Sequence, residues 1–140
     1  MKRRLLWLAF GSYSLVMLWL LFGQRLGAVG EMSLNLHPFE TVRRFLWVLK
    51  HSNQPGMITH AVVNLAGNVV MFVPLGVLLP ALWQGLRRLI RFLPAVVGVI
   101  LAVELLQLVT RLGTCDVDDF ILNLAGALLG YLVWLAMGKP

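Results

Sequence analysis

Four long runs of apolar residues divide the chain. They cover residues 5–22, 58–83, 92–110 and 120–137. The hydrocarbon core of a bilayer is about 30 Å thick and a helix rises about 1.5 Å per residue, so each run can span it as a helix. The pattern therefore predicts an all-α membrane protein with four transmembrane helices, forming a single membrane domain over residues 1–140.

The first run has a second interpretation, as a signal peptide, because Lys2, Arg3 and Arg4 precede it. Its apolar stretch is longer than the roughly 7–15 residues of a signal-peptide core. Residues 23–25, Gly-Gln-Arg, also lack a small-x-small cleavage site. We therefore interpret the first run as a retained span.

A shorter periodic pattern lies between the first two runs. Its apolar positions recur every three or four residues, at Phe39, Val42, Leu46 and Leu49. This spacing predicts an amphipathic helix at about residues 38–50, with Pro38 at its first position. We expect it to lie in the membrane interface, in the first extracytoplasmic loop, with Trp47 at headgroup depth. A helix outside the membrane that packs on the bundle is the alternative.

Composition agrees with this pattern. Hydrophobic residues make up 59% of the chain, charged residues 13%, and the mean hydropathy is +0.83. A soluble domain averages roughly 45–50% apolar and about 25% charged residues. The four runs use so many of the apolar residues that too few remain for a separate soluble core. The isoelectric point of about 10.5 does not indicate nucleic-acid binding, because basic residues of a membrane protein more often mark its orientation. The single cysteine, Cys115, excludes an intramolecular disulfide.

The basic residues predict an orientation. If the N-terminus is cytoplasmic, the cytoplasmic side carries Lys2, Arg3, Arg4, Arg87, Arg88, Arg91 and Lys139. The opposite side then carries Arg25, Arg43, Arg44, Lys50 and Arg111. Since cytoplasmic loops are enriched in Lys and Arg, we expect both termini inside and a location in the bacterial cytoplasmic (inner) membrane.

Several polar residues fall inside the apolar runs. Glu104 is the only acidic residue well inside a span, and a charge at a helix centre costs at least roughly 2.5–3.5 kcal/mol. Gln107 and Arg111 follow at i+3 and i+7, on the same helix face. Asn64 lies about as deep in its run as Glu104, on the outer side, and Asn68 follows it at i+4. Asn123 stands one turn inside the fourth run, also on the outer side. We interpret Glu104 as functional, whereas the asparagines fit either a polar cluster or interhelical hydrogen bonds.

Two further groups of residues flank or enter the spans. Small residues that favour close helix packing are Gly67, Gly76, Gly126 and Gly130. Half of the acidic residues stand before the fourth run, as Asp116, Asp118 and Asp119. Helix capping by Asp118 or Asp119 explains one of them well, and a site for a divalent cation or a cationic headgroup is the alternative. The spacing does not match a calcium-binding loop, and we assign no metal ion or cofactor.

Four motifs occur in order over about residues 34–131. They are Asn35-Leu36-His37-Pro38-Phe39, Asn64-Leu65-Ala66-Gly67-Asn68 with Phe72-Val73-Pro74-Leu75-Gly76, Glu104-x-x-Gln107-x-x-x-Arg111, and Asp116-Val117-Asp118-Asp119-x-x-x-Asn123-x-x-Gly126-x-x-x-Gly130. Together they resemble the VanZ-like family, apart from His37, where that family often carries an apolar residue. The resemblance implies a link to teicoplanin resistance without an established biochemical mechanism. It implies these characteristic polar residues: Asn64, Asn68, Glu104, Gln107, Arg111, Asp116, Asp118, Asp119 and Asn123.

Three hypotheses follow for the function. The first is a bacterial envelope protein that modulates glycopeptide or lipoglycopeptide susceptibility, or binds an envelope lipid, at an outward-facing polar pocket. Its partners would be membrane lipids, a lipid-linked cell-wall precursor or a lipoglycopeptide. The second is an intramembrane lipid-processing enzyme that uses buried carboxylates, which we disfavour because no nucleophile–base pair is visible. The third is a small transporter or assembly subunit, oligomeric through Gly126-x-x-x-Gly130.

Overall fold

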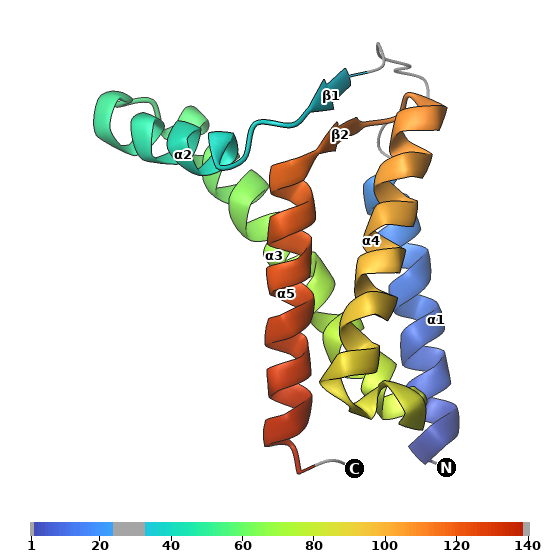
Figure 1. Cartoon of the computed structure of the whole chain (residues 1–140). Helices are drawn as coiled ribbons and strands as arrows, with labels where there is room; N and C mark the ends of the chain where they lie inside the picture. Colours follow the sequence, from blue (N-terminus) through green and yellow to red (C-terminus); the bar gives the residue numbers. More distant parts are fainter. Residues whose placement is uncertain (1, 24–32, 139–140) are drawn as a thin grey trace.

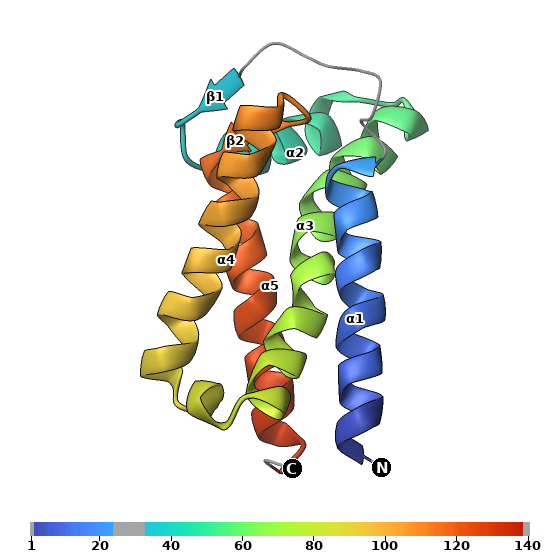
Figure 2. The same cartoon turned by 90° about the vertical axis from the view of Figure 1, so that its right-hand side faces the viewer.

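The computed structural model describes residues 2–23 and 33–138. Four long helices run side by side in it, as Figures 1 and 2 show: α1 (Lys2–Leu21), α3 (Pro55–Leu82), α4 (Leu89–Thr110) and α5 (Val117–Ala136). Each is long and apolar enough to cross a membrane. The prediction of an all-α, multi-pass membrane protein is confirmed. The start of α1 and the end of α5 lie at the same end of the bundle (Figure 1).

The core forms mainly where α3 packs against α5. Gly76, Gly126 and Gly130 lie at this contact, and a side chain at any of them would meet the backbone of the other helix. Gly67 is not part of the contact, because a side chain there would meet nothing within 4 Å. The small residues of the two helices therefore set how closely their backbones approach.

The outer helices are tied to this pair by side chains. The hydroxyl of Tyr13 on α1 donates a hydrogen bond to the Met71 carbonyl oxygen of α3, at 2.9 Å. Phe92 and Ile100 bury one face of α4 against the core. The 3-10 helix η2 (Gln84–Arg87) joins α3 to α4, and the Tyr131 hydroxyl of α5 donates to the Arg87 carbonyl oxygen, at 2.7 Å.

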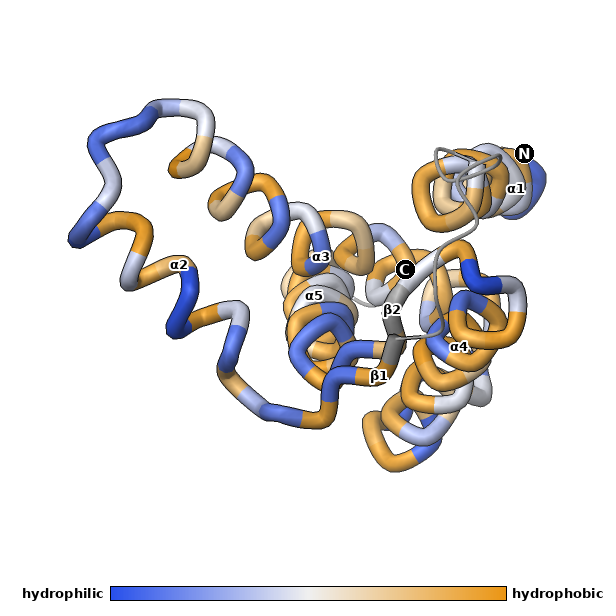
Figure 3. Tube along the Cα trace, turned by 90° about the horizontal axis from the view of Figure 1, so that it is seen from above, coloured by the Kyte–Doolittle hydropathy of each residue, from blue (hydrophilic) through white to orange (hydrophobic). Residues whose placement is uncertain are grey.

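The short amphipathic helix exists as α2 (Glu40–His51). It begins two residues later than predicted, so the assignment of Pro38 to its first position is wrong. Phe39 has a left-handed conformation, with a φ of 64°, and separates the turn at Pro38 from the helix. Seen along the bundle axis, α2 extends to one side of the four spans (Figure 3).

Two faces of α2 differ in what covers them. Phe45 and Val48 line a narrow cavity against the first turns of α3, and Val48 is buried. Leu46 and Leu49, which belong to the predicted apolar stripe, are about half exposed, as is Trp47. The helix thus packs on the bundle through one face and leaves another apolar face uncovered by the described residues.

Two strands that the sequence did not predict close the end of the bundle opposite the termini. Strands β1 (Ser33–Asn35) and β2 (Thr114–Asp116) pair in parallel, with Leu34 opposite Cys115 and Asn35 opposite Asp116. Each has three residues, too few to show a period of two in the sequence. Their pairing brings the segment before α2 to the start of α5 (Figure 1).

Candidate functional site

A polar cavity of about 340 Å³ lies between all four spanning helices, in the half of the bundle that β1 and β2 close. Leu20 and Leu21 contribute from the end of α1. The polar lining comes from the other three helices: His60, Asn64, Asn68, Glu104, Gln107, Asp119 and Asn123. The lining thus combines acceptor oxygens of two carboxylates and four amides with one imidazole, surrounded by apolar helices.

The cavity brings together six of the polar residues singled out in the sequence. These six are Asn64, Asn68, Glu104, Gln107, Asp119 and Asn123. Glu104, Gln107 and Asn123 are buried, with 3–6% of their surface exposed, whereas Asn64 is exposed at the rim. The expectation that residues of the second, third and fourth runs meet at one depth agrees with this arrangement.

Hydrogen bonds between helices hold the polar lining in place. Asn68 donates from Nδ2 to Oδ1 of Asp119 at 2.5 Å, which joins α3 to α5. Gln107 donates from Nε2 to the Leu21 carbonyl oxygen at 3.3 Å, which joins α4 to the end of α1. Glu104 accepts from the Asp116 amide at 3.2 Å, which joins α4 to β2. These three side chains therefore also fix contacts between the elements that line the cavity.

Asn123 differs from these residues in its hydrogen bonding. It is only 3% exposed, and its Oδ1 atom has no hydrogen-bond partner among the described residues. A buried acceptor without a donor costs about 1–3 kcal/mol, and such groups are rare in folded proteins. Asn123 is also one of the residues that line the cavity.

The match to a family model agrees with the residue pattern. The VanZ/LLP1 model matches residues 10–138, which include every residue of the cavity lining. The chain belongs to the VanZ/LLP1 family. No curated protein and no solved structure matches the chain.

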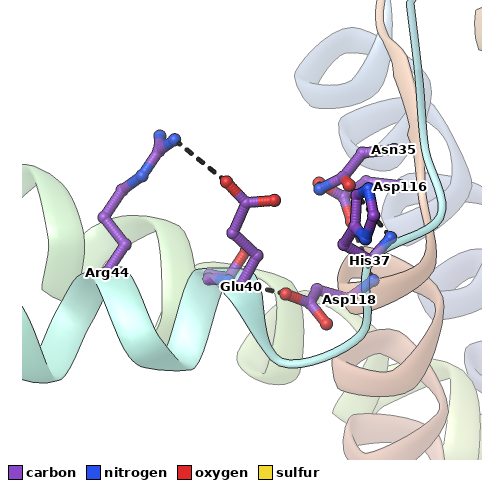
Figure 4. Close-up of polar contacts among 7 residues, drawn as sticks. Asn35, His37, Glu40, Arg44, Asp116 and Asp118 are labelled. Atoms are coloured by element: carbon purple, nitrogen blue, oxygen red, sulfur yellow. Dashed lines mark hydrogen bonds and ion pairs between the residues drawn. The ribbon is translucent and has the colours of Figure 1, made fainter.

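In this VanZ/LLP1 protein, Asp118 fastens α2 to the bundle. It is 3% exposed, and its two carboxylate oxygens accept hydrogen bonds from the amides of Phe39, at 2.5 Å, and Thr41, at 2.6 Å. The free N–H groups at the start of α2 thus receive their acceptor from another helix. The carboxylate is directed toward the start of α2 (Figure 4).

Asp116 is the residue that caps α5, which corrects the assignment of the cap to Asp118 or Asp119. Its side chain accepts from the Asp118 amide at 2.8 Å and from Nδ2 of Asn35 at 3.1 Å. Figure 4 shows Asn35 and Asp116 side by side at the strand pair. The three aspartates therefore have separate partners, and within residues 2–23 and 33–138 no cluster of three His, Cys, Asp or Glu side chains could hold a metal ion.

Arg111 does not line the cavity, although the i+7 spacing placed it on the face of Glu104. The helix ends at Thr110, and Arg111 follows in a left-handed conformation with a φ of 56°. Its side chain is exposed. The end of α4 agrees with the predicted end of the third run at residue 110, but the i+7 spacing treated Arg111 as if it were still helical.

His60 is the lining residue that sequence reasoning missed. It lies at the rim of the cavity with Asn64 and Asn68. The three residues are spaced i, i+4 and i+8, which places them along one side of α3. This spacing was present in the sequence, but His60 stands at the edge of its apolar run, where a polar residue is common.

Proposed function

We propose that this protein spans the bacterial cytoplasmic membrane and binds the headgroup of an envelope amphiphile in the polar cavity. The amphiphile would be a lipid-linked cell-wall precursor or a lipoglycopeptide, which share sugar hydroxyl and amide donors on a lipid tail. Binding would alter the susceptibility of the cell to glycopeptide antibiotics. The buried, unpartnered Oδ1 atom of Asn123 is the observation that carries this proposal.

The chemistry of the lining favours a headgroup rich in hydrogen-bond donors. Glu104 and Asp119 bring two carboxyl groups to the cavity, and ionised carboxylates accept hydrogen bonds but do not donate them. Hydroxyl, amide and amine groups of a headgroup fit such a lining. The volume of about 340 Å³ is at the lower end of the roughly 300–1,000 Å³ typical of small-molecule sites, which suits one part of a larger headgroup.

The route into the cavity suits a ligand that arrives from the membrane. Val63 lines the cavity and is 63% exposed, so an apolar side chain stands at its rim. The lipid tail of an amphiphile would remain in contact with such surfaces while the headgroup enters between the helices. The bilayer would hold the tail at the level of the cavity before and after binding, and the polar lining would supply the specificity.

The proposed orientation places the cavity on the outer side of the membrane. Within residues 2–23 and 33–138, more Lys and Arg residues lie at the end of the bundle with the termini than at the end with the cavity, which favours cytoplasmic termini. The uncovered apolar face of α2 fits the outer membrane interface at the same level. A headgroup exposed on the outer leaflet would therefore reach the cavity without crossing the bilayer.

Replacement of Asn123 by leucine tests the proposal. Leucine is close to asparagine in size and removes the unpartnered acceptor, so Asn123→Leu should leave the free energy of unfolding unchanged or raised. Loss of one hydrogen bond to the ligand should weaken binding of the lipid-linked precursor or of teicoplanin about fivefold to tenfold. Titration of purified protein in nanodiscs with each ligand measures binding and distinguishes the two sources.

Arg111→Ala is the matched control, because Arg111 is exposed and does not line the cavity. Strains that produce equal amounts of each variant should show the wild-type teicoplanin susceptibility for Arg111→Ala and an altered one for Asn123→Leu. Binding and susceptibility that are the same in wild type and Asn123→Leu would exclude this cavity as the site.

A further inference from the structure

A second, larger cavity lies at the opposite end of the bundle. It measures about 940 Å³ and is bounded by the start of α1, the end of α3, η2 and the end of α5. Most of its wall is apolar, from side chains such as Leu6, Val77 and Leu82. It shares no residue with the polar cavity, so its function can be tested separately.

Two arginines give this apolar cavity a positive wall. Arg3 enters it from α1 and Arg87 from η2, and none of the described residues that line it is acidic. Arg87 is held in position, because its Nε donates to the Pro80 carbonyl oxygen at 3.3 Å and its Cζ lies 6.0 Å from the centre of the Trp134 ring. An apolar cavity with a cationic wall complements a molecule that has an anionic head and an apolar tail.

Trp134 adds a second observation. Its side chain is fully buried and lines the cavity, yet its Nε1 atom has no hydrogen-bond acceptor among the described residues. Indole Nε1 is a donor only, and buried indole N–H groups usually find an acceptor. An oxygen atom of a bound molecule would satisfy it.

Aromatic residues mark the depth of the cavity in the membrane. Trp83 lines it and packs edge-on against Trp7 and Phe10 of α1, with ring centres 5.1 and 5.3 Å away. Tryptophan and arginine gather at the level of the lipid headgroups. The arginines therefore lie at headgroup level, and the apolar wall extends from there toward the bilayer centre.

We propose that this cavity is a binding site for one anionic phospholipid from the leaflet on the side of the termini. The phosphate lies between Arg3 and Arg87, and an acyl chain fills the apolar part. An oxygen of the headgroup or of the ester linkage accepts from Nε1 of Trp134. The lipid fills the space between α1 and the α3–α5 pair at this end of the bundle.

Lipid retention tests this site. The full chain is reconstituted into vesicles of equal parts phosphatidylglycerol and phosphatidylcholine with the same acyl chains, then extracted in mild detergent, and the lipid retained is quantified by mass spectrometry. Wild-type protein should retain phosphatidylglycerol in preference. The Arg3→Gln/Arg87→Gln variant should lose this preference, by about fivefold for each arginine.

Arg88→Gln/Arg91→Gln is the matched control, because it removes the same charge from the same end and neither residue lines the cavity. It should keep the wild-type preference. Ala9→Trp should reduce retention of both lipids with unchanged helical content, since Ala9 lines the cavity and is exposed. Equal retention of the two lipids by wild type, or the same loss in the control as in the cavity variant, would overturn the proposal. Unchanged retention by Ala9→Trp would do the same.

Discussion

The close contact between α3 and α5 predicts that Gly126→Ala lowers the free energy of unfolding. A Cβ atom at Gly126 would lie 2.0 Å from the carbonyl oxygen of Val69 on α3, and such contacts are essentially never below 3.0 Å. The obstacle is backbone, which cannot move aside by a change of rotamer. The two helices must therefore separate by at least about 1 Å at this point.

This separation lowers the free energy of unfolding. Adding a single methyl group to a well-packed contact typically costs roughly 1–3 kcal/mol. The strain also falls next to the Asn68–Asp119 hydrogen bond, because Asn68 directly precedes Val69 on α3. We therefore expect Gly126→Ala to destabilise the protein by at least about 1 kcal/mol and to weaken ligand binding in the polar cavity.

Gly67→Ala on α3 is the matched control. A Cβ atom at Gly67 would meet nothing within 4 Å, and alanine is the better helix former, so its stability should stay equal or rise by up to about 1 kcal/mol. Unfolding of both variants in mixed micelles, followed by circular dichroism against added dodecyl sulfate, gives the two free energies. Equal values for the two variants would refute the argument that glycine sets this helix contact.

Two further predictions concern the end of the bundle that carries the polar cavity. Asp118→Ala removes the carboxylate from two amide donors at the start of α2, each bond worth roughly 1.5–3 kcal/mol, so hydrogen exchange of the first α2 amides should accelerate. Glu40→Gln, at a half-exposed carboxylate paired only with Arg44 on the same helix, should change this exchange little. Equal exchange in both variants would contradict the role of Asp118. Burial raises the pKa of the Cys115 thiol, and the carboxylates of Glu104 and Asp116 raise it further. A raised pKa means less thiolate at a given pH, so a membrane-impermeant maleimide should label Cys115 from outside the cell with a more alkaline midpoint than a free thiol, and Glu104→Gln should lower that midpoint. Labelling that requires cell lysis would contradict the outward orientation.

Individual residues show how far the sequence predicts the polar site. The depth of Glu104, Asn64 and Asn123 within their runs indicated that these residues lie at one level, and all three line the polar cavity. The separate hydrogen-bond partners of Asp116, Asp118 and Asp119 were not predictable. Asp118 binds Phe39, which is 79 positions away, and this pairing depends on how β1 and β2 meet. The same holds for Arg111, whose left-handed conformation just beyond α4 takes it off the helix face on which the i+7 spacing placed it.

The sequence by itself determined that the protein is helical, crosses the membrane four times and carries a short amphipathic helix. This is a local property, because the bilayer demands about 20 apolar residues for each span and satisfied backbone hydrogen bonds within each one. Only the tertiary structure decided which polar residues share a cavity, which aspartates fasten α2, and where the second cavity lies. Those outcomes depend on which helix faces meet and at what distance, and at the α3–α5 contact that distance is set by glycines whose neighbours are far away in the chain.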